Sequence, residues 1–126
     1  MKLSSLANLL SQRLSASEYS AEIAGDIAEY TRRLAKPGSH VPIRVTEDID
    51  LLLDRGGLGL LCRLFACGQL TADELAYTAD VLELAERVEF AGPDVASDLS
   101  ECTDPEINGS LSAARALEIA GTGTAV

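Results

Sequence analysis

Three Ser/Thr-x-x-Glu motifs constrain the fold of this chain more than any other feature of its sequence. They lie at Ser15 to Glu18, Thr71 to Glu74 and Thr103 to Glu106. In such a capping box the hydroxyl accepts a hydrogen bond from the N3 amide, and the carboxylate accepts one from the N-cap amide. Each motif therefore predicts the start of a helix.

Glycine and proline residues divide the rest of the chain into short segments with helical spacing of their apolar residues. The pattern predicts helices over 4–14, 17–35, 46–55, 58–67, 72–90, 94–101 and 104–120. The stretch "HVPIRV" reads as extended, and one such stretch cannot form a sheet. We expect an all-α, compact single-domain bundle of about five to seven helices over residues 1–121, with a frayed tail at 122–126.

The composition agrees with helix packing. The chain is 47% hydrophobic but only 4% aromatic, so its core must consist mainly of Leu, Ala, Ile and Val. Charged residues interrupt every apolar stretch before the roughly 20 residues that a membrane-spanning helix needs. Gln12 and Arg13 also lie where a signal peptide would be apolar. We expect a soluble cytoplasmic protein that does not bind membranes.

The cysteines and the single histidine do not suggest a metal site. Cys62 and Cys67 are five residues apart on a predicted helix and point in different directions, and three cysteines are an odd number. Free buried thiols are therefore expected rather than a disulfide. His40 lies in a predicted loop, far in sequence from any cysteine. No metal and no cofactor is predicted.

The glycine-rich stretch "RGGLGLL", residues 55–61, does not fit a phosphate-binding loop. A dinucleotide fingerprint needs a third glycine where this chain has Cys62, and no Gly-Lys-Ser or Gly-Lys-Thr follows. The glycines are instead expected to join two helices. In that interpretation Gly56 ends one helix, Gly57 relaxes the corner and Gly59 allows close helix packing. No catalytic residue is identified, and we do not expect an enzyme.

The acidic residues are concentrated in one part of the chain. Residues 71–106 hold eleven acids and a single base, Arg87, and so account for the whole formal net charge of −10. Such a field repels nucleic acid and anionic membranes and attracts basic proteins or cations. An exposed face that only aids solubility is the alternative.

The stretches "VTEDIDLLLDRGGLGLLCRLFACGQLTADELAYTADVLELAE" and "CTDPEINGSLSAARALEIAG" combine an acidic segment, a leucine-rich helix, a capped central helix and the start of a last helix. Over roughly residues 45–120 this arrangement resembles small helical immunity proteins of bacterial contact-dependent growth inhibition and other polymorphic toxin systems. The resemblance implies a protein that binds a cognate toxin domain and blocks its active site. Many such toxins are nucleases with basic clefts, which an acidic inhibitor would occupy in place of the phosphate backbone.

We therefore expect an immunity protein whose partner is a basic toxin domain. The candidate contact residues are exposed acids, first those of the predicted helix 72–90 and of the chain beyond it, then those of the predicted helix 46–55. They are Asp80, Glu83, Glu86, Glu89, Asp94, Asp98, Glu101 and Asp104, followed by Asp48, Asp50 and Asp54. The alternative function is a helical adaptor or regulatory module of a bacterial or phage complex. The sequence is compatible with a monomer or a dimer.

Overall fold

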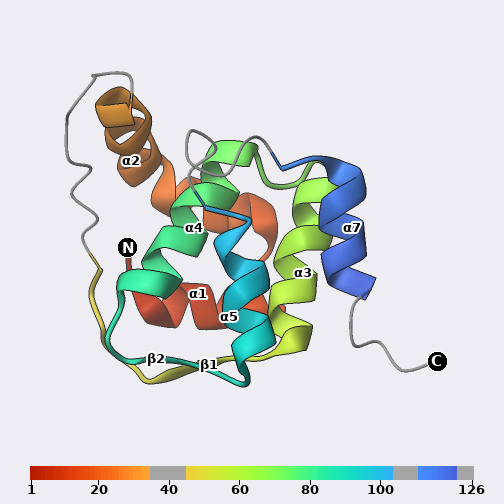
Figure 1. Ribbon diagram of the computed structural model, residues 1–126. Helices are drawn as coiled ribbons and strands as arrows, with labels where there is room; N and C mark the ends of the chain where they lie inside the picture. The colour runs from red at the N-terminus through yellow and green to blue at the C-terminus, as the bar shows by residue number, and fades with distance from the viewer. Residues whose placement is uncertain (35–44, 104–110, 122–126) are drawn as a thin grey trace.

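The computed structural model of the protein describes residues 1–34, 45–103 and 111–121. Within these ranges the chain is mostly helical, which confirms the expected all-α class (Figure 1). A pair of short parallel strands, β1 and β2, is an addition that the sequence did not predict. The elements in chain order are α1 (Leu3–Leu10), α2 (Ala16–Leu34), β1 (Leu51–Leu53), α3 (Arg55–Ala66), α4 (Ala72–Leu84), β2 (Val88–Phe90), α5 (Pro93–Ser100) and α7 (Ala113–Gly121).

Two of the three predicted capping boxes are confirmed. At the start of α2, the Glu18 amide donates to Ser15 Oγ at 3.1 Å, and the Ser15 amide donates to Glu18 Oε1 at 3.3 Å. At the start of α4, the corresponding distances between Thr71 and Glu74 are 3.1 and 2.8 Å. The third box includes Glu106, which lies outside the described residues.

The predicted helix 46–55 is wrong. The segment is extended, and its last part is β1, which pairs with β2 in the register Leu51 with Val88 and Leu53 with Phe90. The helix begins only at residue 55 because Asp54 is its N-cap, with Oδ1 accepting a 2.7 Å hydrogen bond from the Gly57 amide.

The predicted helix 72–90 is too long at its C-terminal end. α4 ends at Leu84, and the backbone of Ala85 is already extended. The following residues alternate between buried Val88, exposed Glu89 and half-buried Phe90, which is the period of a strand rather than of a helix.

The first predicted helix is also too long, because α1 ends at Leu10 rather than at residue 14. Gln12 has a φ of 63°, and this left-handed residue turns the chain away from the helix.

The glycines at the start of α3 do not join two helices. Gly56 and Gly57 lie in its first turn, after a strand. Gly59 does allow a close approach, as expected, and the helix that approaches it is α7. A Cβ on Gly59 would lie 3.4 Å from the carbonyl oxygen of Ala120. α7 packs along the length of α3 and covers one side of the helical body (Figure 1).

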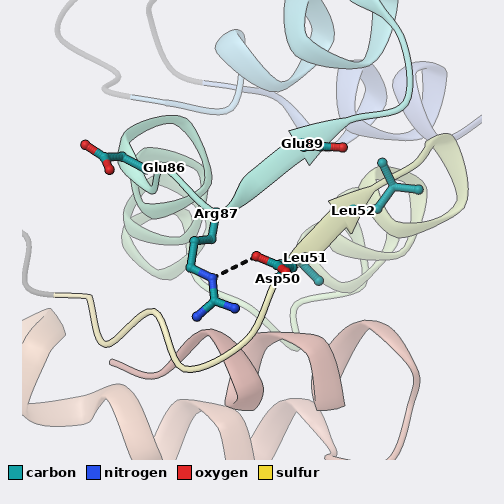
Figure 2. A pocket seen from close by; sticks show the side chains of 6 residues that line it. All are labelled: Asp50, Leu51, Leu52, Glu86, Arg87 and Glu89. Atoms are coloured by element: carbon teal, nitrogen blue, oxygen red, sulfur yellow. Dashed lines mark hydrogen bonds and ion pairs between the residues drawn. The ribbon is translucent and has the colours of Figure 1, made fainter.

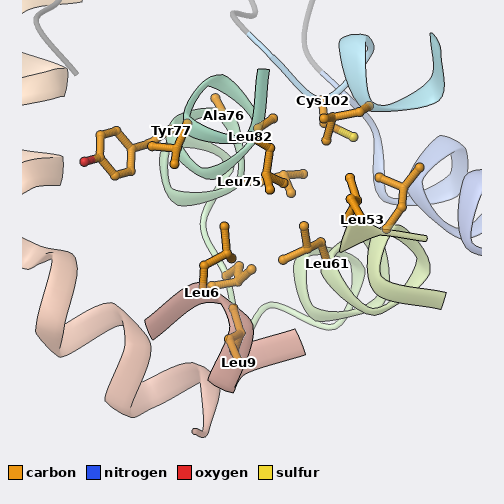
Figure 3. Packing of buried hydrophobic residues seen from close by; sticks show 14 of the residues in the cluster. Leu6, Leu9, Leu53, Leu61, Leu75, Ala76, Tyr77, Leu82 and Cys102 are labelled. Carbon is orange, nitrogen blue, oxygen red and sulfur yellow. The ribbon is translucent and has the colours of Figure 1, made fainter. Parts of the chain in front are cut away.

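The core lies between α1, α3, α4 and the inner side of β1, and leucines fill most of it. Figure 3 shows Leu6, Leu53, Leu61 and Leu75 converging from these four elements. Each fully buried leucine contributes roughly 1.5–3 kcal/mol relative to an exposed one. Tyr19 places a polar group in this core, where its hydroxyl and that of Thr78 form a 2.7 Å hydrogen bond.

None of the helices in the described ranges is both long enough and apolar enough to cross a membrane. His40 and residues 122–126 lie outside the described residues, as does the start of the predicted helix 104–120. The single-domain prediction stays a prediction.

Replacement of Thr71 by alanine should destabilise the protein by about 1 kcal/mol, because the Glu74 amide then loses its acceptor. Urea unfolding followed by circular dichroism would measure this as a lower midpoint. Ser17→Ala is the control, since Ser17 is exposed within the first turn of α2 and its hydroxyl makes no hydrogen bond with a described residue. Equal midpoints for Thr71→Ala and the wild type would contradict the capping role.

Candidate binding surface

The outer side of the two-stranded sheet carries the most distinctive group of exposed side chains. Side chains alternate along each strand, so Leu53 and Val88 point into the core while Leu52 and Glu89 point outward. The parallel register places Leu52 directly beside Glu89. Leu52 is 58% exposed and so offers an apolar side chain beside the Glu89 carboxylate.

Arg87, just before β2, ties this strand to the segment that precedes β1. Its Nε donates to Asp50 Oδ1 at 2.7 Å, and its Nη1 donates to the carbonyl oxygen of Glu47 at 2.7 Å. Its backbone amide donates to Glu47 Oε1 at 2.8 Å. The hydrogen bond from Arg87, with its positive charge, lowers the pKa of Asp50 below its usual range. The only base of the acidic segment is therefore engaged within the protein.

A shallow hollow of about 440 Å³ lies over this sheet (Figure 2). Its lining holds three carboxylates and one guanidinium, so its formal charge is negative. Glu86 and Glu89 are exposed, and their carboxylates make no hydrogen bond or ion pair with any described residue. In Figure 2 their side chains extend away from the Arg87 and Asp50 pair. The lining residues are Asp50, Leu51, Leu52, Glu86, Arg87 and Glu89.

Other predicted contact residues have internal partners. Asp48 accepts hydrogen bonds from the Ser4 amide at 3.0 Å and from its hydroxyl at 2.6 Å, which lower the pKa of Asp48. Asp54 is the N-cap of α3. Asp80 accepts a 2.8 Å hydrogen bond from the Tyr30 hydroxyl and is half-buried, so the expectation of an exposed side chain was wrong for it.

The acids of α5 are paired with arginines. Arg55 binds Asp94 at 2.7 Å and Asp98 at 2.8 Å, which ties α5 to the start of α3. Its hydrogen bond lowers the pKa of Asp94. Asp98 is half-buried rather than exposed. These two acids stabilise the helix arrangement and are only partly available to a partner.

The last candidates are Glu83, Glu101 and Asp104. Glu83 is exposed and accepts a 3.1 Å hydrogen bond from the Ser100 hydroxyl. Glu101 is half-buried, and Arg115 of α7 binds it through two hydrogen bonds of 2.7 and 2.8 Å. Asp104 lies outside the described residues. The structure thus brings only Asp50, Glu86 and Glu89 of the predicted set to the hollow.

Sequence reasoning missed two residues of this surface. Leu52 was assigned to a helix, and Arg87 was counted only as an exception among the acids. The alternation in "RVEF" was the available signal, because it indicates a strand with Arg87 and Glu89 on the same face.

The hollow offers only a few kinds of side chain to a binding partner. Its lining offers carboxylates, one engaged guanidinium and leucine side chains, with no imidazole, hydroxyl or thiol. In the described parts of the chain, no group of three His, Cys, Asp or Glu side chains is placed to hold a metal ion. The thiols lie elsewhere: Cys62 and Cys102 are buried and are not joined in a disulfide, as expected, whereas Cys67, at the end of α3, is exposed contrary to expectation.

No protein-family model, curated protein or solved structure matches the chain. The resemblance to immunity proteins therefore stays a prediction. Function is inferred from the geometry and charge of this surface.

The ion pair between Glu101 and Arg115 should make stability depend on pH. Arg115 lowers the pKa of Glu101 in the folded state, so the pair stabilises the protein above the unfolded pKa of about 4.3. This contribution is lost as the pH falls through the lower folded pKa. Arg115→Gln should therefore be less stable than the wild type at pH 7, and the difference should shrink below about pH 4.

Urea midpoints measured from pH 7 to pH 3 would test this expectation. Arg63→Gln is the matched control, because Arg63 is exposed and its guanidinium makes no hydrogen bond or ion pair with a described residue. A difference between Arg115→Gln and the wild type that is the same at pH 7 and pH 3 would contradict it.

Proposed function

We propose that this protein is an immunity-type inhibitor that acts in the cytoplasm and binds a basic toxin domain through the outer side of its two-stranded sheet. The observation that carries the proposal is the pair of exposed acids, Glu86 and Glu89, beside the exposed Leu52. Within the described ranges no cation pairs with either acid, and Arg87, which lines the same hollow, is engaged by Asp50 and Glu47.

Charge supports a basic partner. An excess of negative charge on one surface raises the rate at which a positively charged protein associates with it. Close charge pairs across an interface have measured coupling energies of roughly 1.5–7 kcal/mol. Glu86 and Glu89 can form such pairs without breaking a contact within the protein, whereas Asp94 and Asp98 would have to release Arg55.

Leu52 supplies the apolar contact that charged groups alone lack. Binding energy usually concentrates in a few well-packed central side chains surrounded by polar residues that exclude water. Leu52 projects beside Glu89, on the side of the hollow away from the Arg87 and Asp50 pair (Figure 2). A partner would therefore present an apolar pocket or side chain to Leu52 and basic side chains to the neighbouring glutamates.

The surface is held in place before binding. Hydrogen bonds between β1 and β2 and the contacts of Arg87 fix the backbone that carries Leu52 and Glu89. Binding then requires little ordering of the chain, which reduces its entropic cost. The resemblance to immunity proteins favours a nuclease toxin as the partner, because carboxylates can take the place of phosphates in its cleft.

The partner would be sought by purifying the tagged protein from its native host at low and moderate salt. Retention of a basic toxin domain, with its toxicity suppressed on co-expression, would support the proposal. Retention of a housekeeping assembly would overturn it in favour of the adaptor function.

Reversal of both glutamates, Glu86→Lys with Glu89→Lys, should lower the association rate constant with that toxin domain by about tenfold or more at low salt. The difference should narrow at high salt, where charges are screened. Biolayer interferometry over a salt series would measure both effects. Glu22→Lys is the control, since Glu22 is an exposed acid on α2 without a partner among the described residues. Equal rates for all three proteins would place the interface elsewhere.

Replacement of Leu52 by alanine should act on dissociation instead. Loss of a central apolar contact should cost about 1–2 kcal/mol and raise the dissociation rate constant about tenfold. Leu117→Ala on α7 is the matched control, because Leu117 is similarly exposed at 54% and does not line the hollow. An unchanged dissociation rate for Leu52→Ala would exclude Leu52 from the interface.

A further inference from the structure

Two buried thiols lie next to each other in the core. Cys62 is in the middle of α3, and Cys102 is in the turn that follows α5. Their Sγ atoms are 4.0 Å apart, and the residues are 0% and 3% exposed. Cys102 is labelled in Figure 3 at the edge of the leucine core. The third thiol, Cys67, is exposed and is not part of this pair.

The separation of the sulfur atoms is small enough for bond formation. A disulfide requires the two sulfurs to lie about 2.0 Å apart, with their Cα atoms within about 7 Å. Closing the gap requires the two side chains to move toward each other by about 2 Å in total. Cys102 lies beyond the last residue of α5, so such a movement does not have to distort a helix at that position.

A small hollow reaches Cys102, one member of this pair. It has a volume of about 50 Å³, and Cys102 and Thr103 line it together with apolar side chains that include Phe65 and Leu75. This volume is sufficient for one molecule of the size of water or hydrogen peroxide. A small oxidant can therefore reach Cys102, whereas a protein thiol cannot.

The two thiols also differ in acidity. A hydrogen bond from Cys102 lowers the pKa of Cys62 and outweighs the opposing effects of burial and of the Asp98 carboxylate. The same hydrogen bond, together with burial, raises the pKa of Cys102. One sulfur of the pair is thus more easily ionised than an isolated buried thiol, and the thiolate is the reactive form.

We propose that Cys62 and Cys102 form an oxidisable dithiol, which hydrogen peroxide converts into a disulfide that joins α3 to the end of α5. One sulfur, as the thiolate, attacks a peroxide oxygen. The O–O bond breaks, a sulfenic acid forms, and the departing hydroxide takes up a proton to become water. The second sulfur attacks the sulfenic sulfur, the S–S bond forms and a second water leaves with its proton. The two thiols lose two electrons, and the peroxide is reduced to two waters.

The bond would close a large loop of the chain. The two cysteines are 40 residues apart in sequence, and a cross-link over such a distance restricts the unfolded state strongly. Arg55 already ties the first turns of α5 to α3 through Asp94 and Asp98. The disulfide would fix the other end of α5 to the same helix. The oxidised protein should therefore unfold at a higher temperature than the reduced one.

The full chain, first reduced and then treated with hydrogen peroxide, provides the test. Unreacted thiols are alkylated in denaturant, and peptide mapping identifies the cross-link. We expect a disulfide between Cys62 and Cys102, one remaining alkylated thiol at Cys67 and a rise in Tm of roughly 10 °C. The reductant dithiothreitol should reverse the rise.

Cys67→Ser is the matched control and should show the same cross-link and the same rise in Tm. Cys102→Ala should show neither, and the mapping of the wild-type protein stands even if this variant fails to fold. Recovery of Cys62 and Cys102 as alkylated thiols after peroxide has oxidised Cys67 would overturn the proposal. A disulfide that includes Cys67 would overturn it as well.

Discussion

The arrangement of the described structure depends on α3, the helix against which α1, α4, α5 and α7 all pack. Three local features allow α3 to pack against four other helices. Asp54 starts it directly after a strand, so the helix begins at the edge of the sheet. Gly59 removes a side chain where α7 approaches, and Arg55 reaches out to bind both acids of α5. Leucines fill the remaining contacts, which agrees with a composition poor in aromatic residues.

Features encoded over a few residues could be predicted from the sequence. Thr71 and Glu74 define the start of α4 by themselves, and the structure shows both hydrogen bonds of their capping box. The segment 46–54 was misread because Thr46 resembles an N-cap but has Ile49, rather than a glutamate, at the N3 position. The residue that caps a helix is Asp54. The pairing of β1 with β2 joins residues 37 positions apart, and no local pattern specifies such a pairing.

For the candidate surface too, the sequence predicted local features but not the contacts between residues distant in sequence. The concentration of acids in one segment directed attention to Glu86 and Glu89, which line the hollow. Charge alone could not separate them from acids with structural roles. The partner of Asp48 is 44 residues away in sequence, and that of Asp80 is 50 residues away. Only the folded chain shows that most of the acidic residues first considered hold the protein together, and that a smaller group faces outward without a partner.

The parallel pairing of the two strands also determines when the surface can exist. Parallel strands cannot be joined by a tight turn, and here α3 and α4 form the crossover between β1 and β2. The loop between them must close before the strands gain any hydrogen bond, and closure of long loops slows folding. Leu52 and Glu89 therefore become neighbours only when this crossover has closed. An incompletely folded chain carries the same charges but does not hold Leu52 beside Glu89. A partner that needs both residues would therefore bind only the folded protein.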